Sequence, residues 1–332
     1  MAAEALRALI EETGFSGVVT VSKSGEPDIG IAAGFADRAQ RRPNRIDTAF
    51  ATASMTKGFV AVTVMSLVES GDLALDTRVR DLLGDDLPLV DPGVTIEHLL
   101  SHRSGVGDYL DEEQLGDIDE YIFGDTSMHT LETPDDYLPF VAAHPQLSAP
   151  GKRFAYNNGG FIMLSLAIER ATGGRFHDLV RELVLEPAGM SMGFVRADDL
   201  PANVALGYLA NGRTNVFHLP VIGGGDGGAY VTAADMAAFW LAFFGGRLVS
   251  AETVAAMTVP VSQTNEEGMR YGRGFWLSPS GTRVLLEGMD AGVSARSCHD
   301  PATGDAYTVL ANDSSGAWPI VRYLEGTGTV RS

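Results

Sequence analysis

Apolar and polar positions follow different patterns at the ends of the chain and in its middle. The β-branched run from Ser16 to Val21, the turn of residues 23–27 and the run from Ile29 to Phe35 predict a strand hairpin, which follows an N-terminal helix ending at Gly14. The nearly continuous apolar residues from Phe59 to Val68 predict a helix that is buried on most sides. Helical periodicity, interrupted by long polar connections, dominates the part of the chain that follows.

Strand patterns return in the last third of the chain. They cover residues 274–277, 282–286 and 306–311, and a final helix is expected near residues 318–324. Strands at both ends with helices between them predict an α/β (α+β) fold, in which the two chain ends build one sheet domain and a mainly helical domain is inserted. The expected boundaries are residues 1–57 and 215–332 for the sheet domain and residues 58–214 for the inserted domain.

The composition is that of a folded protein with an acidic surface. Of the 332 residues, 45% are hydrophobic and 20% are charged, which are ordinary proportions for a globular chain. The formal net charge of -19 argues against nucleic acids and anionic membrane surfaces as partners. No run of 18 apolar residues occurs, so no membrane-spanning helix is expected.

Cysteine usage and the N-terminus predict a cytoplasmic protein. The lone Cys298 excludes an intramolecular disulfide and is compatible with a reducing compartment. Residues 1–7 lack the basic and apolar segments of a signal peptide and have the pattern of a helix start. An exported form that has been trimmed is the alternative.

Two further polar segments are distinctive in composition but do not by themselves indicate a function. The acidic connection of residues 108–136 has the length of a lid or an exposed flap, and its role is left open. The glycine cluster of residues 223–228 lacks the following lysine and the spacing of a nucleotide-binding loop. We therefore do not expect a nucleotide cofactor.

The strongest local chemical signal is a serine followed three residues later by a lysine. Ser54 and Lys57 precede the apolar helix, and a separation of three residues places both side chains on one helical face, about 5–6 Å apart at Cβ. A lysine desolvated against an apolar helix can lose its charge and take the proton of a serine hydroxyl. The alternative is a helix-capping serine with a solvated lysine.

A second polar loop carries a tyrosine and an asparagine. Tyr156 and Asn158 lie between the loop signal Pro150-Gly151 and an apolar helix starting near Phe161. A tyrosine near Ser54 can shuttle protons, and an asparagine amide can bind a substrate carbonyl. Considered alone, Tyr156 is better explained as a half-buried packing residue.

These motifs, taken in order, resemble the serine β-lactamase and penicillin-binding-protein superfamily, closest to its class C β-lactamase and esterase branch. Thr52 to Lys57 is similar to the nucleophile motif, and Tyr156 to Asn158 is similar to the Tyr-x-Asn element. The flanking segments that also match are residues 99–106, 150–154, 227–235 and 271–276. The resemblance implies an antiparallel sheet flanked by helices, with the active site in the cleft between the two domains. It also implies that Ser54 is acylated, that Lys57 and Tyr156 share the proton transfers and that Asn158 helps to position the substrate.

The third motif of this family departs from its usual pattern here. The family places Lys-Thr-Gly, His-x-Gly or Trp-x-Gly on a strand that lines the cleft, and the corresponding segment is assigned to residues 288–293, with Met289 at the position of the basic or aromatic residue. Met289 cannot form a charge-assisted hydrogen bond with a substrate carboxylate, and Asp290 would repel it. A backbone N–H near Gly292 is expected to supply the second oxyanion donor. Recognition of β-lactams is therefore not expected.

The other candidate residues have ordinary structural explanations. His102 is expected to be a hydrogen-bonded core histidine and Cys298 a buried thiol. Glu287 and Asp290 could act as an acid–base pair, but solvated or ion-paired carboxylates are commoner. The seven histidines show no metal-binding spacing, so neither a metal nor another cofactor is expected.

The expected function is hydrolysis through an acyl-enzyme on Ser54, with a neutral or cationic small-molecule ester or amide as the substrate. An esterase is favoured over an amidase. The alternatives left open are a β-lactamase, a D,D-peptidase or D-aminopeptidase-like activity, a transacylase, and a sensor that is acylated without turnover. The substrate's identity and the oligomeric state are left open as well.

Overall fold

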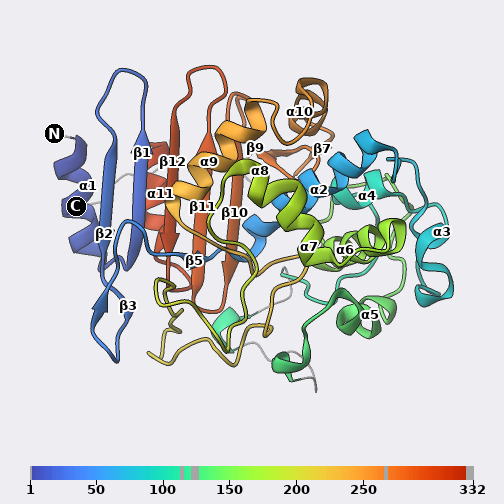
Figure 1. Cartoon of the computed structure of the whole chain (residues 1–332), viewed down its shortest axis with the longest axis horizontal. Coiled ribbons are helices and arrows are strands. Elements are labelled where there is room, and N and C mark those ends of the chain that lie inside the picture. Colours follow the sequence, from blue (N-terminus) through green and yellow to red (C-terminus); the bar gives the residue numbers. More distant parts are fainter. Residues whose placement is uncertain (1, 113–115, 121–126, 265–267, 327–332) are drawn as a thin grey trace.

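The computed structural model of the chain describes residues 2–112, 116–120, 127–264 and 268–326. Its centre is an eight-stranded sheet in the order β2-β1-β12-β11-β10-β9-β8-β7 (Figure 1). Every neighbouring pair of strands in this sheet is antiparallel. The strands are β1 Gly17–Ser22, β2 Ile29–Ala33, β7 Ser262–Gln263, β8 Arg270–Tyr271, β9 Trp276–Leu277, β10 Val284–Asp290, β11 Val293–His299 and β12 Ala306–Ala311.

Both ends of the chain contribute to this sheet, as the sequence predicts. Strand β1, from the N-terminal part, lies between β2 and β12, and Val19 pairs with Val309 across the junction. The predicted hairpin of β1 and β2 is confirmed, and so is the strand that covers residues 306–311. Four short strands form two small sheets outside the main one: β3 Phe35–Asp37, β4 Arg42–Pro43, β5 Phe50–Ala51 and β6 Tyr230–Val231.

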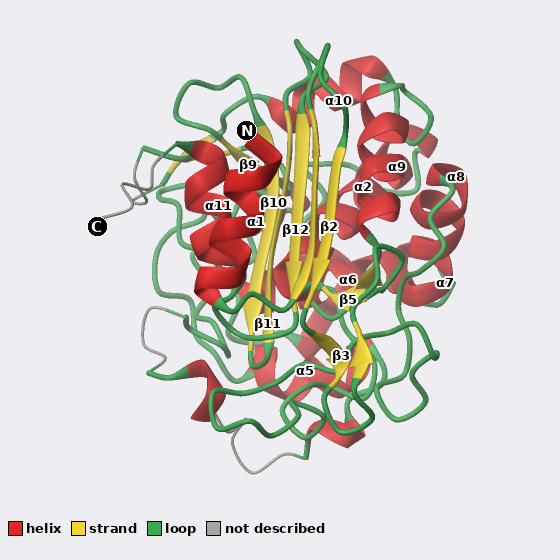
Figure 2. Cartoon of the chain, turned by 90° about the vertical axis from the view of Figure 1, so that its left-hand side faces the viewer, coloured by secondary structure: helices red, strands yellow, loops and turns green. Residues whose placement is uncertain are grey.

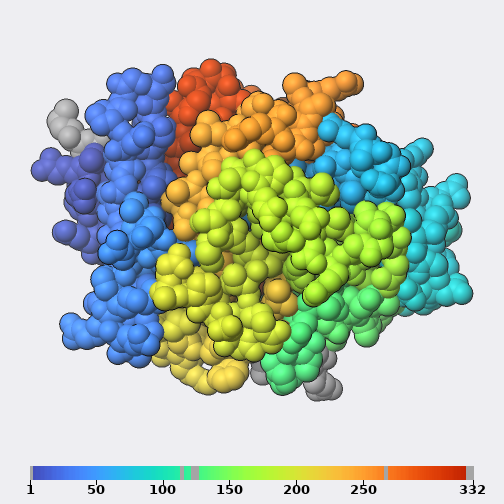
Figure 3. Space-filling view, in the orientation of Figure 1, coloured from blue at the N-terminus to red at the C-terminus, as the bar shows by residue number. Residues whose placement is uncertain are grey.

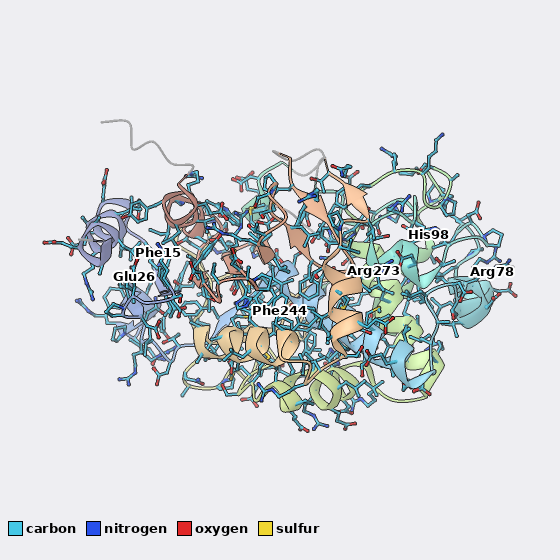
Figure 4. The ribbon with its side chains drawn as sticks, turned by 90° about the horizontal axis from the view of Figure 1, so that it is seen from above. Phe15, Glu26, Arg78, His98, Phe244 and Arg273 are labelled. Carbon is cyan, nitrogen blue, oxygen red and sulfur yellow. The ribbon has the colours of Figure 1, made fainter. Side chains whose placement is uncertain are left out.

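Helices cover both faces of the sheet (Figure 2). Because side chains alternate along a strand, Val19 and Val309 belong to the core under the terminal helices, whereas Val18 and Leu310 belong to the core under α2 and α9. Seen from above, α9 lies on one side of the strands, with Phe244 at its end, and α1 and α11 lie on the other (Figure 4). The covering helices are α1 Ala2–Thr13, α2 Thr56–Ser70, α9 Ala233–Phe244, α10 Ala251–Thr258 and α11 Ala317–Glu325.

A mainly helical region lies between β5 and β6. Its central helix, α6, is capped by the Asn157 side chain, which accepts a hydrogen bond from Gly160 N, and ends at Gly173 in the left-handed conformation. The helices of this region are α3 Val79–Leu83, α4 Ile96–Leu100, α5 Pro134–Ala142, α6 Asn158–Thr172, α7 Phe176–Val180 and α8 Glu186–Ala188. A π-helical turn covers Arg181–Leu185, and 3₁₀ turns cover Ala53–Met55, Gly84–Asp86, Ile118–Glu120 and Met128–Thr130.

The helical region is joined to the sheet by the pair Arg273 and Glu97. Arg273 Nε lies 2.5 Å from Glu97 Oε2, and the two residues come from the turn before β9 and from α4. Figure 4 shows Arg273 beside this region, where His98 is also labelled. The separation into residues 1–57 with 215–332 and residues 58–214 remains a prediction. None of the described helices has the length and apolar character needed to cross a lipid bilayer.

The sequence pattern does not predict strand β11, because polar residues interrupt its apolar positions. Arg296, in the middle of the strand, is neutralised by Glu287 on β10 and by Glu325 on α11. Ser297 accepts a hydrogen bond of 2.8 Å from Trp240 Nε1 and lies 2.8 Å from Thr308 Oγ1. Ion-pair and hydrogen-bond partners on other elements therefore satisfy these polar side chains, so that the segment can form a central strand.

Aromatic side chains of α9 anchor this helix to the sheet and to α2. The Phe239 ring has no exposed surface and lies 5.0 Å from the ring of Phe59 on α2. Leu241, two residues further along α9, is 67% exposed.

Replacement of Phe239 by alanine should therefore lower the free energy of unfolding by about 3–5 kcal/mol. Leu241→Ala is the matched control on the same helix, and it should change that free energy by no more than about 0.5 kcal/mol. Urea denaturation of the two variants and the wild type measures both values. Equal losses in the two variants would contradict the assigned packing of α9.

Candidate active site

Ser54 lies on a tight turn between β5 and α2 rather than on the α-helix itself. The 3₁₀ turn Ala53–Met55 precedes α2, which begins at Thr56. Ala53 has a φ of 46°, a left-handed conformation that an alanine adopts only when its surroundings impose it. Thr52 holds the start of the turn, because its N–H and its hydroxyl both donate to the carbonyl oxygen of Ala229, at 2.9 and 2.8 Å.

The Lys57 side chain is buried and reaches Ser54, as the spacing predicts. Its Nζ lies 2.8 Å from Ser54 Oγ, 2.7 Å from Asn158 Oδ1 and 2.6 Å from the backbone oxygen of Asp226. Only 1% of Lys57 is exposed. The two carbonyl-type oxygens can only accept hydrogen bonds, whereas the Ser54 hydroxyl can either accept or donate. A neutral amine, with two N–H groups and one lone pair, therefore satisfies all three contacts.

Burial lowers the pKa of Lys57 below its ordinary value of 10.5. Desolvation is the largest cause, and nearby carboxylates, with Asp226 first and then Glu112, oppose it. The aromatic rings of Tyr156 and Phe161 lie 5.0 and 5.7 Å from Nζ and contribute to the apolar surroundings. The site therefore shifts Lys57 toward the uncharged state that a base requires.

Tyr156 is brought to the same point. The Ser54 side chain is close enough to its hydroxyl to lower its pKa, and its ring stacks on Trp276 with a centroid distance of 6.0 Å. Burial raises the pKa of Tyr156 well above its ordinary value, and the charge of Glu112 raises it further. The phenol therefore keeps its proton near neutral pH. Ser54, Lys57 and Tyr156 thus converge as the sequence predicts.

His102 fixes the loop that carries Tyr156. Its backbone oxygen accepts a hydrogen bond of 2.8 Å from Ala155 N, and its Nδ1 accepts one of 3.0 Å from Asn157 N. The imidazole ring also lies 4.3 Å from the ring of Tyr156. Desolvation, with Lys57 nearby, lowers the pKa of His102 well below its ordinary value, so the ring is neutral. The placement fits the predicted buried structural histidine.

Asn158 lies where the sequence predicts, but its amide is already occupied. Its Oδ1 accepts from Lys57, and its Nδ2 donates to the Leu110 oxygen at 3.0 Å and to Glu112 Oε1 at 2.9 Å. Both ends of the amide bind the protein itself, and the predicted role of Asn158 in positioning the substrate stays a prediction. In this arrangement Asn158 orients Lys57.

Asp108 binds the start of α6 and thereby supports Asn158. Its two carboxylate oxygens accept hydrogen bonds from Asn158 N at 2.6 Å and from Gly159 N at 2.8 Å. Burial raises the pKa of Asp108 to about 7, although these N–H groups and Lys57 act in the opposite direction. The acidic segment of residues 108–136 thus contributes directly to the site, while its residues 113–115 and 121–126 lie outside the described residues.

The glycine cluster of residues 223–228 supports the nucleophile turn instead of binding a nucleotide. A Cβ at Gly225 would collide with the backbone oxygen of Phe161, and one at Gly227 would lie 3.4 Å from the backbone of Ala53. This close approach brings the Asp226 oxygen to Lys57. The sequence signal for this packing was the high density of glycines, because residues without a Cβ allow two backbone segments to lie in contact.

The third-motif assignment is wrong in its placement of the oxyanion donor. Gly292 N donates to Ser314 Oγ at 2.7 Å, in the turn between β10 and β11, and Gly292 does not line the cavity that holds Ser54. Gly288 lies beside the nucleophile instead, because a Cβ on it would meet the Thr52 oxygen and lie 2.7 Å from Ser54 N. Met289 and Asp290 line the cavity, as the sequence predicts.

A cavity of about 430 Å³ opens at Ser54. Its walls come from the nucleophile turn, the described part of residues 109–119, the 195–230 segment and the end of β10. In the space-filling view, the yellow-green to yellow part of the chain, which includes most of the 195–230 segment, covers the middle of the face shown (Figure 3). Five carboxylates line the cavity, and no lysine or arginine is among the lining residues that the structure describes; the carboxylates are Glu112, Asp117, Asp119, Asp226 and Asp290.

The remaining candidates lie outside this cavity. Glu287 forms an ion pair with Arg296 and does not pair with Asp290. Cys298 is buried on β11, and burial raises the pKa of its thiol to about 12. Within the described ranges, no group of three or more His, Cys, Asp or Glu side chains is arranged to hold a metal ion.

An antiparallel sheet between two helical layers, with a Ser-x-x-Lys pair at the start of a buried helix, defines the class of proteins with the β-lactamase/transpeptidase fold. This chain belongs to the Beta-lactamase family, whose model matches residues 2–322.

Solved and curated relatives agree with this assignment. The crystal structure of a penicillin-binding protein from Bacillus halodurans superposes with a TM-score of 0.90 at 38% identity, covering 97% of this chain and 100% of that one. The esterase EstB of Burkholderia gladioli is 37% identical over 61% of this chain and 52% of its own. A D-aminopeptidase of Cereibacter sphaeroides is 30% identical over 68% of this chain and 42% of its own. The chain thus spans about half the length of these two curated relatives.

The contact between Gly288 and the nucleophile turn gives a direct test of this geometry. Gly288→Ala should move the Ser54 turn and reduce the rate at which a fluorophosphonate labels Ser54 by at least about tenfold, since misplaced nucleophiles react slowly. Gly116→Ala is the control, because Gly116 lines the same cavity and a Cβ there meets no atom of the described residues within 4 Å. Unchanged labelling of both variants would show that Gly288 does not position Ser54.

Proposed function

We propose that the protein is a serine hydrolase that forms an acyl-enzyme on Ser54, most favourably as an esterase or amidase acting on neutral or cationic small molecules. The observation that carries the proposal is the buried Lys57 amine, 2.8 Å from Ser54 Oγ, with its other two contacts made to acceptor oxygens. The printed names of the esterase and D-aminopeptidase relatives support the same reaction class.

Lys57 is the general base in the proposed acylation. Its lone pair takes the Ser54 proton while Oγ attacks the carbonyl carbon, and the two N–H groups of the amine stay on Asn158 and Asp226. Tyr156 does not suit this first role, because its raised pKa keeps the phenol protonated.

Tyr156 instead passes a proton to the leaving group. Its hydroxyl is close to the Ser54 side chain and can protonate the departing alcohol or amine as the tetrahedral intermediate collapses, and Lys57 then returns the proton to the phenol. Water follows the same path in reverse and releases the acid from Ser54. An alcohol or amine in place of water gives acyl transfer, so the transacylase alternative shares this mechanism.

The oxyanion is held by backbone N–H groups. The Ser54 N–H is one donor, and a second comes from β10 next to Gly288, where the strand approaches the nucleophile turn most closely. This assignment replaces Gly292, whose N–H is bound to Ser314. Preorganised donors of this kind are worth about 10²–10³ in kcat.

The substrate preference follows from the charges of the cavity. Its carboxylates repel an anionic substrate, and no lysine or arginine lines the described walls to bind a carboxylate. Neutral or cationic esters and amides are therefore the preferred substrates, and β-lactams, with their carboxylate, are disfavoured. The cytoplasmic location remains a proposal supported by the single Cys298.

The test uses p-nitrophenyl butanoate with the wild type and the variants Ser54→Ala and Lys57→Met. Both variants should lose roughly 10³-fold or more in kcat/KM, because each lacks one member of the nucleophile–base pair. Lys152→Ala, which removes an exposed lysine, should retain the wild-type value. Hydrolysis of the ester by the Ser54→Ala variant at the wild-type rate would contradict the proposal. Stoichiometric fluorophosphonate labelling without turnover of any acyl donor would favour the acylated sensor.

A further inference from the structure

Asp290, at the end of β10, places a carboxylate in the cavity wall. Its Oδ1 accepts a hydrogen bond of 2.7 Å from Ala291 N. Among the residues that the structure describes, Asp290 takes part in no ion pair. A half-buried carboxylate in this state costs free energy unless a cation binds to it.

Other carboxylates deepen the negative potential at the same place. Asp226 and Glu112 both act to raise the pKa of Asp290, and the protonated form of Lys57 acts in the opposite direction. The side chains of Asp226 and Glu112 already have neutral partners, since Tyr109 donates to Asp226 and the Asn158 amide donates to Glu112. Asp290 is thus the carboxylate of this group that is best able to take a new partner.

Tyr137 provides a second and independent indication of a binding site in this cavity. The residue is 2% exposed, and its side chain comes from α5 and lines the same cavity. Its hydroxyl finds no hydrogen-bond partner among the described residues. Tyr137, Asp226 and Asp290 line the same cavity, and both carboxylates act electrostatically on this hydroxyl. A buried hydroxyl without a partner is rare, because leaving it unpaired costs about 1–3 kcal/mol.

We propose that Asp290 and Tyr137 form a subsite for an ammonium group of the substrate. The inference rests on the proposed function, because the ammonium belongs to the ester or amide that acylates Ser54. An ammonium group has three N–H donors and no acceptor. The carboxylate of Asp290 and the phenol oxygen of Tyr137 accept two of them, and Asp226 adds charge behind them. The substrate class is therefore amino-functionalised esters or amides.

The protonation of Asp290 makes this recognition dependent on pH. Burial, together with Asp226 and Glu112, raises the pKa of Asp290 to about 7. Lys57 on α2 and the hydroxyls of Tyr137 and Tyr230 also face this carboxylate. A raised pKa means that Asp290 gains its charge only as the pH rises through about 7. The KM for a cationic substrate should fall over this range, whereas the KM for a neutral analogue should not follow it.

The experiment compares p-nitrophenyl 3-aminopropanoate with p-nitrophenyl butanoate, which has a methyl group where the former has an ammonium. The ratio of their kcat/KM values, cationic over neutral, is measured at pH 6 and pH 8 in the wild type, Asp290→Asn and Tyr137→Phe. Asp290→Asn should lower the ratio at least tenfold at pH 8 and remove its increase with pH. Tyr137→Phe should lower the ratio about threefold to tenfold, as expected for one lost hydrogen bond. Because Asp290 also acts on the pKa of Lys57, the neutral ester is the reference within each variant, and only the ratio of the two esters measures the subsite.

Asp117→Asn is the matched control, because Asp117 is an exposed carboxylate on the rim of the same cavity and the substitution removes the same charge. Its ratio should stay within about twofold of the wild type. A ratio that is unchanged in Asp290→Asn, or that falls equally in Asp117→Asn, would overturn the subsite while Ser54-dependent turnover of the neutral ester leaves the proposed function intact.

A binding measurement covers the case in which neither ester is turned over. Isothermal titration calorimetry of the Ser54→Ala variant with n-butylammonium, and with n-butanol as the neutral control, measures the affinity of the subsite without catalysis. Binding of the ammonium that is lost in the double variant Ser54→Ala/Asp290→Asn supports the inference. Equal binding of both probes, or no dependence on Asp290, contradicts it.

Discussion

The removal of the Lys57 amine from water is the constraint on which the rest of the site depends. A buried ammonium is costly, and the protein lowers this cost by favouring the neutral amine. Two acceptor oxygens, from Asn158 and Asp226, hold the amine beside Ser54; in the proposed mechanism they take its two N–H groups and leave its lone pair for the Ser54 proton. The same desolvation that lowers the pKa of Lys57 raises that of Tyr156, so one apolar environment separates the two roles that we propose for these residues.

The surrounding scaffold serves to hold the partners of this amine. Asp108 binds the first N–H groups of α6, and thereby fixes Asn158. The glycine cluster brings the Asp226 oxygen into range, since a side chain at Gly225 would collide with α6. Gly288 lets β10 approach the nucleophile turn. Four parts of the chain therefore meet around Lys57 and Ser54: the segment at Asp108, the start of α6, the glycine cluster of residues 223–228 and strand β10.

The sequence predicted features whose partners are close in sequence and missed those that depend on tertiary contacts. Ser54 and Lys57 are three residues apart, so helical geometry alone brings them together. Asp226 lies 169 residues from Lys57, and no local pattern could reveal that its backbone oxygen is a partner. The choice between Gly288 and Gly292 failed for a similar reason, because only the register of β10 against the nucleophile turn decides which glycine faces Ser54. Strand β11 was missed because Glu287 and Glu325, which neutralise its Arg296, lie on other elements.

The most direct test is the protonation state of Lys57, measured by NMR titration of the side-chain amines in lysine-labelled protein. The chain contains three lysines, and the exposed Lys23 and Lys152 serve as internal references. Our interpretation predicts that Lys57 loses its proton at a pH below the ordinary lysine value of 10.5. Titration of all three lysines together near that value would contradict the assignment of Lys57 as the base.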